Sequence, residues 1–436
     1  MERAGLMIEF YNEELKEKYY KLTHKSGLDV YVFPKKLTSS YALFGINYGS
    51  VDNTFKTADN DEFITVPDGI AHYLEHRMFT QKDGSDITEK FSECGADSNA
   101  YTSFNKTVYL CSATDNFDKA LEHLLCFVTE PNFTDELVER ERGIIISEIN
   151  MGIDDPYTRG FYGVLEAMYS DNSARIDIAG TEESVCKITA EMLNMCYNTF
   201  YNPDNMAVVV CGDITPESVL DIVNRTIPNS FKSVTVDRKY AKDKDTSVYK
   251  KLYEAKMDVS KPIFTIGIKD SFISSLDLDR MKKYAAMSIL CDMIFSKAGD
   301  LYNDLFESGR ISIDFSANYV CSRTFAYTMI SGESDDPFYV FEYIKKYIGD
   351  FKYDDNDFNR CKKVLYAEYV KDFDSTEEIA NNMIDFVFDG FDLFKFGDMI
   401  RSIDRDYVDE LLKTSFKDEY FAMSVIYPKD KDTERS

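Results

Sequence analysis

The order of predicted strands and helices repeats once along the chain, and this repeat limits the folds that the chain can adopt. In the first half, strands at 28–33 and 40–48 precede helices, a strand hairpin at 98–113, further helices, the last of these near 181–201, and a strand at 205–213. The second half follows the same order, beginning with a strand at 262–271 and with a later strand at 311–320. This pattern predicts an α+β fold made of two duplicated domains.

A polar segment with alternating charges separates the two repeats. Residues 229–251 show neither the apolar alternation of a strand nor the apolar spacing of a helix. We therefore predict an N-terminal domain at 1–228, a linker at 229–251 and a C-terminal domain at 252–436. A chain of 436 residues is long enough for two cores of ordinary size.

The charge balance excludes several classes of partner. The chain carries 50 Lys and Arg against 77 Asp and Glu, so its formal net charge is −27. Such a surface repels nucleic acids and anionic membranes, and we expect neither as a partner. The N-terminus lacks the apolar region of a signal peptide, no apolar run is long enough to span a membrane, and the nine cysteines are scattered. A cytoplasmic location is predicted.

One motif carries the chemistry, His72-Tyr73-Leu74-Glu75-His76. The chain has only four histidines, and two of them stand in this motif. We predict that it lies on a helix capped by Asp68, where positions i and i+4 share one face and both imidazoles can bind one ion. Zinc is the ion most compatible with two imidazoles and a carboxylate. Glu75 would then take a proton from the zinc-bound water as a general base.

The alternative is a solvated helix on which two histidines share a face by chance and bind no metal. The surrounding residues argue against it, because four apolar side chains flank the pair. A partly buried pair of imidazoles needs a polar or metal partner. The apolar neighbours are Ile70, Ala71, Leu74 and Met78.

A third ligand is expected on a second helix that begins at Thr134. Glu141 and Glu148 are seven residues apart and therefore share a face of this helix. Glu148 stands in the apolar run GIIISEI, where a carboxylate is costly unless it is paired or coordinating. Glu141 stands in the charged run ERERG, so it can equally be solvated or salt-bridged. Glu148 is the preferred ligand, and Glu141 is the alternative.

The order HxxEH is the inverzincin motif. Together with PDGIAHYLEHRMF, GADSNAYTSFNKTVYLCSA and ERERGIIISEINM, it makes the chain resemble the pitrilysin/insulysin family of zinc peptidases. The duplicated layout is similar to that of the two-domain subunits, such as mitochondrial processing peptidase and especially its bacterial relatives. The resemblance implies domains that are each a mainly antiparallel sheet packed with helices. It also implies a zinc metalloendopeptidase that cleaves peptides or unfolded segments.

The resemblance also implies roles for individual residues. One Zn²⁺ per chain would be bound by His72, His76 and Glu148, with Glu75 as the general base. Glu141 falls on the family's additional acidic position, where it would assist catalysis without binding the metal.

The motif Asn99-Ala100-Tyr101 lies on a predicted strand near the metal. On physical grounds alone this is an ordinary core strand. The resemblance places it at the sheet edge that binds substrate, where an extended peptide can pair with it through main-chain hydrogen bonds.

The second half departs from the family pattern at two positions. In active members the second domain commonly supplies an arginine and, seven residues later, a tyrosine; here Phe306 and Ile313 stand at those positions. Neither side chain can donate a hydrogen bond. We therefore expect a heterodimer with a homologous subunit that supplies the Arg and Tyr, against the alternative of a weakly active monomer. The rival functions are a non-catalytic subunit and a zinc-holding, peptide-binding subunit.

Overall fold

The computed structural model describes residues 7–57, 60–81, 84–229 and 231–429. Contacts group the chain into two compact units, and each unit contains segments from both halves of the sequence. The first unit comprises residues up to 149, 178–240 and 370–394, and the second comprises 150–177, 241–369 and the residues from 395 onward. The predicted limits at 1–228, 229–251 and 252–436 give each domain one continuous segment, and they stay a prediction.

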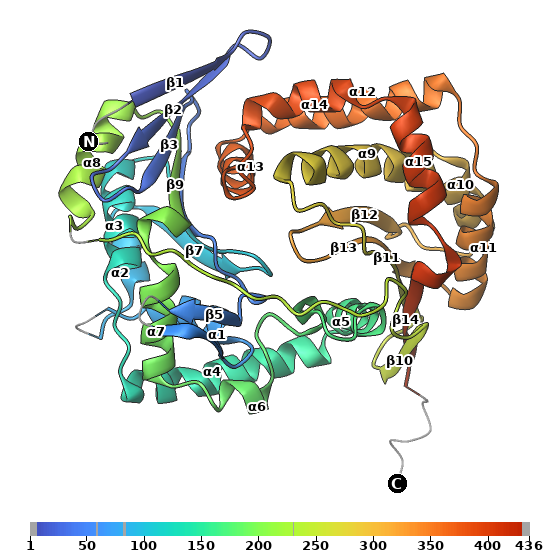
Figure 1. Ribbon diagram of the computed structural model, residues 1–436, viewed down its shortest axis with the longest axis horizontal. Coiled ribbons are helices and arrows are strands. Elements are labelled where there is room, and N and C mark those ends of the chain that lie inside the picture. The colour runs from blue at the N-terminus through green and yellow to red at the C-terminus, as the bar shows by residue number, and fades with distance from the viewer. Residues whose placement is uncertain (1–6, 58–59, 82–83, 230, 430–436) are drawn as a thin grey trace. The chain divides into compact units, whose positions relative to one another are not determined.

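The first unit is built on a seven-stranded sheet with the order β1-β2-β3-β9-β4-β8-β7 (Figure 1). Only β3 and β9 run parallel, and all other neighbours are antiparallel. A separate hairpin pairs β5 with β6. The strands are β1 (Met7–Asn12), β2 (Glu17–Thr23), β3 (Asp29–Pro34), β4 (Ser40–Ile46), β5 (Thr54–Thr57), β6 (Asn60–Thr65), β7 (Ala96–Thr102), β8 (Thr107–Ala113) and β9 (Met206–Gly212).

Helices cover both faces of this sheet. In Figure 1, α3 and α8 lie on one side of the sheet and α13 on the other. Because side chains alternate along a strand, Phe44 of β4 joins the apolar core with α3, whereas Gly45 faces Ile384 of α13. The helices are α1 (Ile70–Met78), α2 (Ile87–Glu93), α3 (Phe117–Thr129), α4 (Asp135–Asp154), α6 (Glu182–Val185), α7 (Ala190–Phe200), α8 (Pro216–Thr226) and α13 (Thr376–Phe388), with a 3₁₀ turn at Pro203–Asn205.

The second unit contains a five-stranded sheet with the order β10-β14-β11-β13-β12. Its strands are β10 (Leu252–Met257), β11 (Ile263–Asp270), β12 (Ser316–Cys321), β13 (Ala326–Glu333) and β14 (Phe421–Pro428). Its helices are α5 (Pro156–Met168), α9 (Asp277–Phe295), α10 (Asp300–Glu307), α11 (Pro337–Asp350), α12 (Asp355–Asp372), α14 (Phe396–Ser402) and α15 (Arg405–Ser415), with 3₁₀ turns at Ser173–Arg175 and Asp418–Tyr420. A further 3₁₀ turn, Leu393–Lys395, lies at the boundary of the two units.

The two sheets share one topology. If β1 and β2 are set aside, the first sheet runs β3-β9-β4-β8-β7, and the second runs β10-β14-β11-β13-β12. In each, the first and last strands of the repeat form the parallel pair, and the third strand lies at an edge. The predicted α+β fold of two duplicated, mainly antiparallel domains is confirmed.

One helix from each half of the sequence packs on the sheet that the other half of the sequence forms. Helix α5 follows α4 in the first half of the chain but packs against β10, β11 and β14. Helix α13 follows α12 in the second half but packs against β4 and β9. Helix α5 was not predicted, although Asp155 caps it by accepting a hydrogen bond from Thr158 N at 2.6 Å and Pro156 occupies its first turn.

Several local predictions were wrong. Asp68 does not cap α1, because Gly69 takes the N-cap position in the left-handed region and Asp68 accepts a hydrogen bond from Asn53 instead. The helix expected at 181–201 is divided into α6 and α7, since Thr189 caps a new helix. The strand expected at 311–320 begins only at Ser316.

One residue of the predicted linker, Asp243, forms a buried ion pair with Lys269 of β11. The Asp243 carboxylate lies 2.7 Å from Lys269 Nζ, and both side chains are almost fully buried. Asp243 also accepts hydrogen bonds from the backbone N–H groups of residues 170–172. Burial raises the pKa of Asp243, but the hydrogen bonds from Lys269 and the backbone outweigh this effect and lower it. This part of the segment is therefore packed structure.

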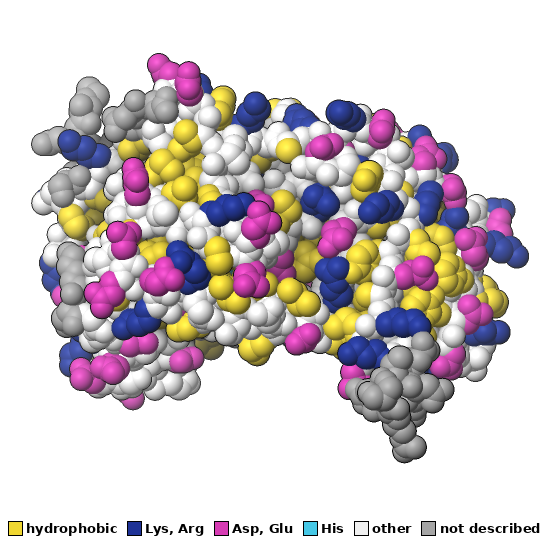
Figure 2. Space-filling view, turned by 90° about the horizontal axis from the view of Figure 1, so that it is seen from below, with side chains coloured by type: hydrophobic (Ala, Val, Ile, Leu, Met, Phe, Trp, Pro, Cys, Tyr) yellow, Lys and Arg dark blue, Asp and Glu magenta, His cyan; other side chains and the backbone are white. Residues whose placement is uncertain are grey.

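The acidic residues do not gather in one place on the face that Figure 2 shows. Asp and Glu side chains lie there among Lys and Arg, with apolar areas between them. Within the described residues, no helix combines the length and the apolar character needed to cross a membrane.

Replacing Gly45 by valine should destabilise the first unit. A Cβ atom at this position would lie 2.6 Å from Ile384 Cγ1, closer than packed carbon atoms approach, so α13 would have to move off the sheet. We expect a loss of about 1–3 kcal/mol in the free energy of unfolding, as is typical of overpacking. Chemical denaturation measures it.

Gly143→Ala is the matched control. This glycine lies in α4, and a Cβ there would meet nothing within 4 Å. Alanine should therefore stabilise the helix by about 0.5–1 kcal/mol. Equal stability of Gly45→Val and the wild type would contradict the close packing of α13 on β4.

Candidate metal centre

Helix α1 is positioned by the residue at which it begins. Gly69 has a φ of 88°, and a Cβ at this residue would lie 2.3 Å from the carbonyl oxygen of Ala179, so only glycine fits. The four apolar neighbours expected around the histidine pair are all buried, which confirms the predicted setting. They are Ile70, Ala71, Leu74 and Met78.

Helix α4 has one buried stripe and contacts α1 through polar side chains. Val138, Ile145 and Ile149 point inward at helical spacing, together with Glu141. The Tyr73 hydroxyl of α1 donates a hydrogen bond to the carbonyl oxygen of Val138. This contact fixes the two helices relative to each other.

The three predicted metal ligands lie together. His72, His76 and Glu148 each offer one ligand atom, and these atoms all lie within 4.8 Å of one another. The Nε2 atom of His72 is 3.6 Å from one oxygen of Glu148, and Nε2 of His76 is 3.3 Å from the other. Two imidazoles and one carboxylate that leave a further position open are the donor set of a catalytic zinc site.

The burial of the two glutamates is the reverse of what the sequence indicated. The side chain of Glu148 is 48% exposed, whereas that of Glu141 is only 11% exposed. The apolar run around Glu148 misled the prediction because α4 is amphipathic, and Ile144 in the same run is 55% exposed. Glu148 reaches the histidines from an accessible face of the helix.

Glu141 is salt-bridged on the inner side of the site. One of its oxygens lies 3.2 Å from Nδ1 of His76, and the other lies 3.2 Å from an Nη atom of Arg77. Arg77 is fully buried and also contacts the carbonyl oxygen of Asn132. A carboxylate on the second nitrogen of a ligand histidine fixes the tautomer and the orientation of the ring.

Arg77 is a site residue that the sequence analysis missed. The signal was an arginine next to His76 on a helix whose neighbouring positions are apolar. Such an arginine is buried only when it has a partner, and Glu141 is that partner here.

The carboxylates of Glu141 and Glu148 beside His76 favour a bound cation. Burial lowers the pKa of His76, but its hydrogen bonds to Glu141 and Glu148 outweigh this effect and raise the pKa to about 10. Hydrogen bonds from His72 and His76 lower the pKa of Glu148. The two carboxylates therefore hold positive charge at this position, and a divalent cation could take the place of the proton. The residues present fit a zinc ion.

Glu75 lies beside this group and is buried, with 7% exposure. Burial raises the pKa of its carboxyl group, although the nearby histidines and Thr102 act in the opposite direction. The hydroxyl of Thr102 donates a 2.6 Å hydrogen bond to Glu75 Oε2. A buried carboxylate with a raised pKa suits a group that accepts and returns a proton near neutral pH.

The predicted substrate strand is the edge strand β7. Asn99 is exposed, and Ala100 and Tyr101 are half-buried. The Tyr101 hydroxyl donates a 3.2 Å hydrogen bond to Asn381 of α13, and Lys106 in the following turn forms an ion pair with Asp385 of α13. The hairpin that carries the motif is thus held on the side that faces α13.

Phe306 and Ile313 are exposed side chains of the second unit, at 43% and 63%. Phe306 is the last residue but one of α10 and stacks on Tyr302, and Ile313 lies in the turn before β12. Nearby, Arg310 is held over the ring of Tyr339 at 4.2 Å. Substitutions at Phe306 and Ile313 would not disturb a core.

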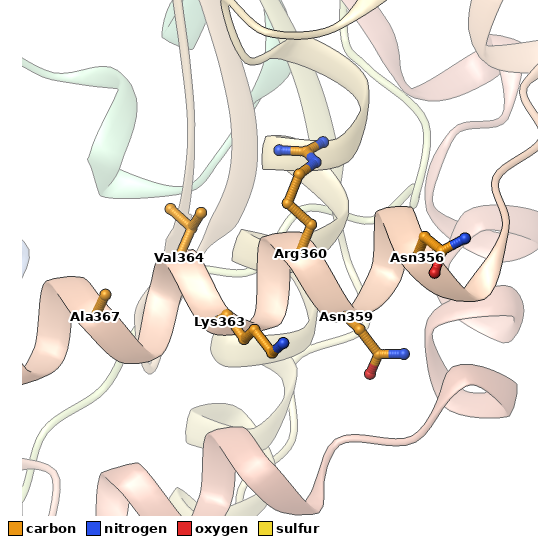
Figure 3. A pocket seen from close by; sticks show the side chains of 6 residues that line it. All are labelled: Asn356, Asn359, Arg360, Lys363, Val364 and Ala367. Atoms are coloured by element: carbon orange, nitrogen blue, oxygen red, sulfur yellow. The ribbon is translucent and has the colours of Figure 1, made fainter.

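Two cavities of the second unit are lined by none of the residues of the metal group. One, of about 400 Å³, lies between α9, β12 and α12. The other, of about 420 Å³, lies along α12 (Figure 3) and is lined by Asn356, Asn359, Arg360, Lys363, Val364 and Ala367. These amide and cationic side chains do not form a metal-binding set.

The donor set is typical of the zinc site of a hydrolase. Comparisons with known proteins identify the family. The chain matches the model "Insulinase (Peptidase family M16)" over residues 62–182 and the model "Peptidase M16 inactive domain" over residues 187–365. It is 35% identical over 426 residues to the uncharacterized zinc protease YmfH of Bacillus subtilis (strain 168). The matched region covers 96% of this chain and 98% of that protein. The chain belongs to peptidase family M16, the insulinase family.

Solved structures agree with this assignment. An M16-like peptidase from Alicyclobacillus acidocaldarius is 30% identical with a TM-score of 0.89, over 94% of this chain and 98% of that chain. A protease from Helicobacter pylori shares the fold at 18% identity, with a TM-score of 0.77, over 94% of this chain and 100% of that chain. The resemblance to the pitrilysin/insulysin family is confirmed.

Metal binding should depend on the three clustered residues. We expect one zinc per chain, and a loss of more than about 100-fold in zinc affinity in His72→Ala and Glu148→Ala, since each removes a ligand. Glu141→Gln should cost less, about 10- to 100-fold, because it removes an orienting partner. Competition with a chromophoric chelator measures the affinities.

His123→Ala is the control, because His123 lies on α3 outside the group. It should bind zinc as the wild type does. Full zinc affinity in Glu148→Ala, together with loss in Glu141→Gln, would transfer the role of third ligand to Glu141.

Proposed function

We propose that this chain is a zinc metalloendopeptidase that cleaves peptides or unfolded segments, with one Zn²⁺ bound by His72, His76 and Glu148. The observation that carries the proposal is the convergence of these three ligand atoms within 4.8 Å beside the buried Glu75. A zinc ion held there would supply Lewis acidity, which polarises a scissile carbonyl and makes water a better acid.

Glu75 is the general base. It takes a proton from the attacking water and then gives that proton to the leaving amine, so the carboxylate is regenerated in each turnover. The raised pKa that burial gives Glu75 favours both transfers near neutral pH. Glu141 acts through His76: it holds the imidazole by Nδ1 and is itself held by Arg77.

The substrate pairs with the edge strand β7 along Asn99, Ala100 and Tyr101. Main-chain hydrogen bonds would hold an extended peptide without requiring a particular sequence. Tyr101 and Lys106, held by α13, keep the hairpin in place for this pairing.

A homologous partner subunit completes the enzyme. Because Phe306 and Ile313 cannot donate side-chain hydrogen bonds, the arginine and tyrosine that the family commonly uses would come from that subunit. All nine cysteines are unpaired, which fits activity in the reducing cytoplasm.

Glu75→Gln tests the proton transfer. The amide keeps the size of the side chain but cannot accept the proton, so cleavage of a quenched fluorescent peptide should fall by about 10²- to 10⁴-fold while zinc content is unchanged. Glu89→Gln, an exposed glutamate of α2, is the control and should cleave normally. If Glu75→Gln cleaved at the wild-type rate, the role of general base would be refuted.

Mixing this chain with a homologous chain tests whether a partner subunit is needed for activity. Adding a homologous chain that carries the arginine and tyrosine but lacks HxxEH should raise kcat/KM by about 10²- to 10³-fold, the effect of one lost oxyanion-side donor. Full activity of the isolated monodisperse chain, with no gain on mixing, would reject the heterodimer. A zinc-loaded mixture that binds peptides without cleaving them would instead identify the peptide-binding subunit.

A further inference from the structure

The hairpin of β7 and β8 carries two threonines that face each other across the strands. Thr102 is the last residue of β7, and Thr107, its cross-strand partner, is the first residue of β8. The Thr102 hydroxyl donates to Glu75 Oε2 at 2.6 Å, the length of a hydrogen bond to a charged oxygen. Thr102 thus joins the sheet to the proposed general base on α1.

The second threonine has a different hydrogen-bond acceptor. Thr107 is fully buried, and its hydroxyl donates to the carbonyl oxygen of Tyr48 at 2.9 Å. The two threonine oxygens lie 3.4 Å apart. A hydroxyl has one proton to donate, so the Thr107 proton is committed to Tyr48, and the Thr102 proton is left for Glu75.

The two oxygens of Glu75 are therefore not equivalent. Oε2 is held by Thr102, whereas Oε1 accepts no hydrogen bond from the described residues. A glutamate side chain has several rotatable bonds, and one contact to a strand removes much of that freedom. Oε1 is then the oxygen available to take the proton from water and to return it to the leaving amine.

We infer that Thr102 is a positioning residue for Glu75, through the hydrogen bond that its hydroxyl donates to Oε2. The inference rests on the proposed role of Glu75 as general base. It differs from a purely structural link between α1 and β7, because it requires the hydroxyl itself to raise the rate of the proton transfer.

The kinetic test compares two substitutions in the full-length, zinc-loaded chain, with the partner subunit present if activity requires it. Thr102→Val keeps the shape but removes the hydroxyl, and it should lower kcat by about 10- to 100-fold, the effect of a lost hydrogen bond to a charged group. KM and zinc content should stay within about twofold of the wild type. Thr102→Ser restores the hydroxyl and should return kcat to within about threefold.

Thr65→Val is the matched control. Thr65 and Thr54 form another cross-strand threonine pair, in the hairpin of β5 and β6, with their oxygens 3.0 Å apart. None of the hydrogen bonds of that pair reaches Glu75. This substitution should leave kcat unchanged.

A second measurement needs no catalysis. In the metal-free protein, a double-mutant cycle of Thr102→Val and Glu75→Ala measures their coupling in the unfolding equilibrium. Thr102→Val should shift this equilibrium constant by about tenfold or more when Glu75 is present, and by little when residue 75 is alanine. The cycle therefore reports the hydrogen bond itself.

The outcomes distinguish a positioning role of Thr102 from a purely structural link between α1 and β7. Coupling in the cycle together with a fall in kcat that serine rescues supports the inference. Absence of coupling overturns it, and so does coupling without an effect on kcat, which would leave only a structural link. If the wild type cleaves no peptide under any condition, the proposed function fails, and the cycle alone then decides whether Thr102 holds Glu75.

Discussion

The pairing of α1 with α4 through opposite charges is the interaction on which the metal centre depends. His72 and His76 lie on one helix and Glu148 on the other, and the buried Glu141 joins His76 to Arg77 at 3.2 Å on each side. A buried carboxylate without these partners would destabilise the packing strongly. The same contacts that hold the helices together thus orient the ring that would bind the metal, so stability and chemistry share one set of residues.

The fold is duplicated, but all four histidines lie in the first repeat. Both sheets have the same strand order, and α9 follows the second strand of its sheet as α1 follows β4 and the β5–β6 hairpin. No histidine occurs after position 123, so the second repeat has no imidazole to offer. The second sheet lies mostly within residues 187–365, which match the model of the inactive domain of family M16. The second repeat keeps the fold without the residues that could bind a metal in the first.

Most of the fold could be predicted because apolar periodicity records which side of each element is buried. The hairpin at 98–113 and the buried strand at 205–213 were recognisable in this way, and so was the helix with the HxxEH motif. The failures have local physical causes. Gly69 displaces Asp68 at the start of α1 by adopting a left-handed conformation, and Asp243 is buried in a segment whose composition resembles a solvated linker. Composition does not reveal a partner that is distant in sequence, such as Lys269.

The sequence by itself determined the duplicated α+β fold and the identity of the metal-ligand candidates, because spacing along a helix fixes which side chains share a face. It could not determine which face of α4 is buried around its glutamates: the apolar run indicated a buried Glu148, whereas the structure buries the salt-bridged Glu141 more deeply. It also could not show that α5 and α13 each pack on the other repeat's sheet, or that Thr102 reaches Glu75. Those contacts join residues far apart in the chain, and only the packing of complete elements brings their side chains within hydrogen-bond distance.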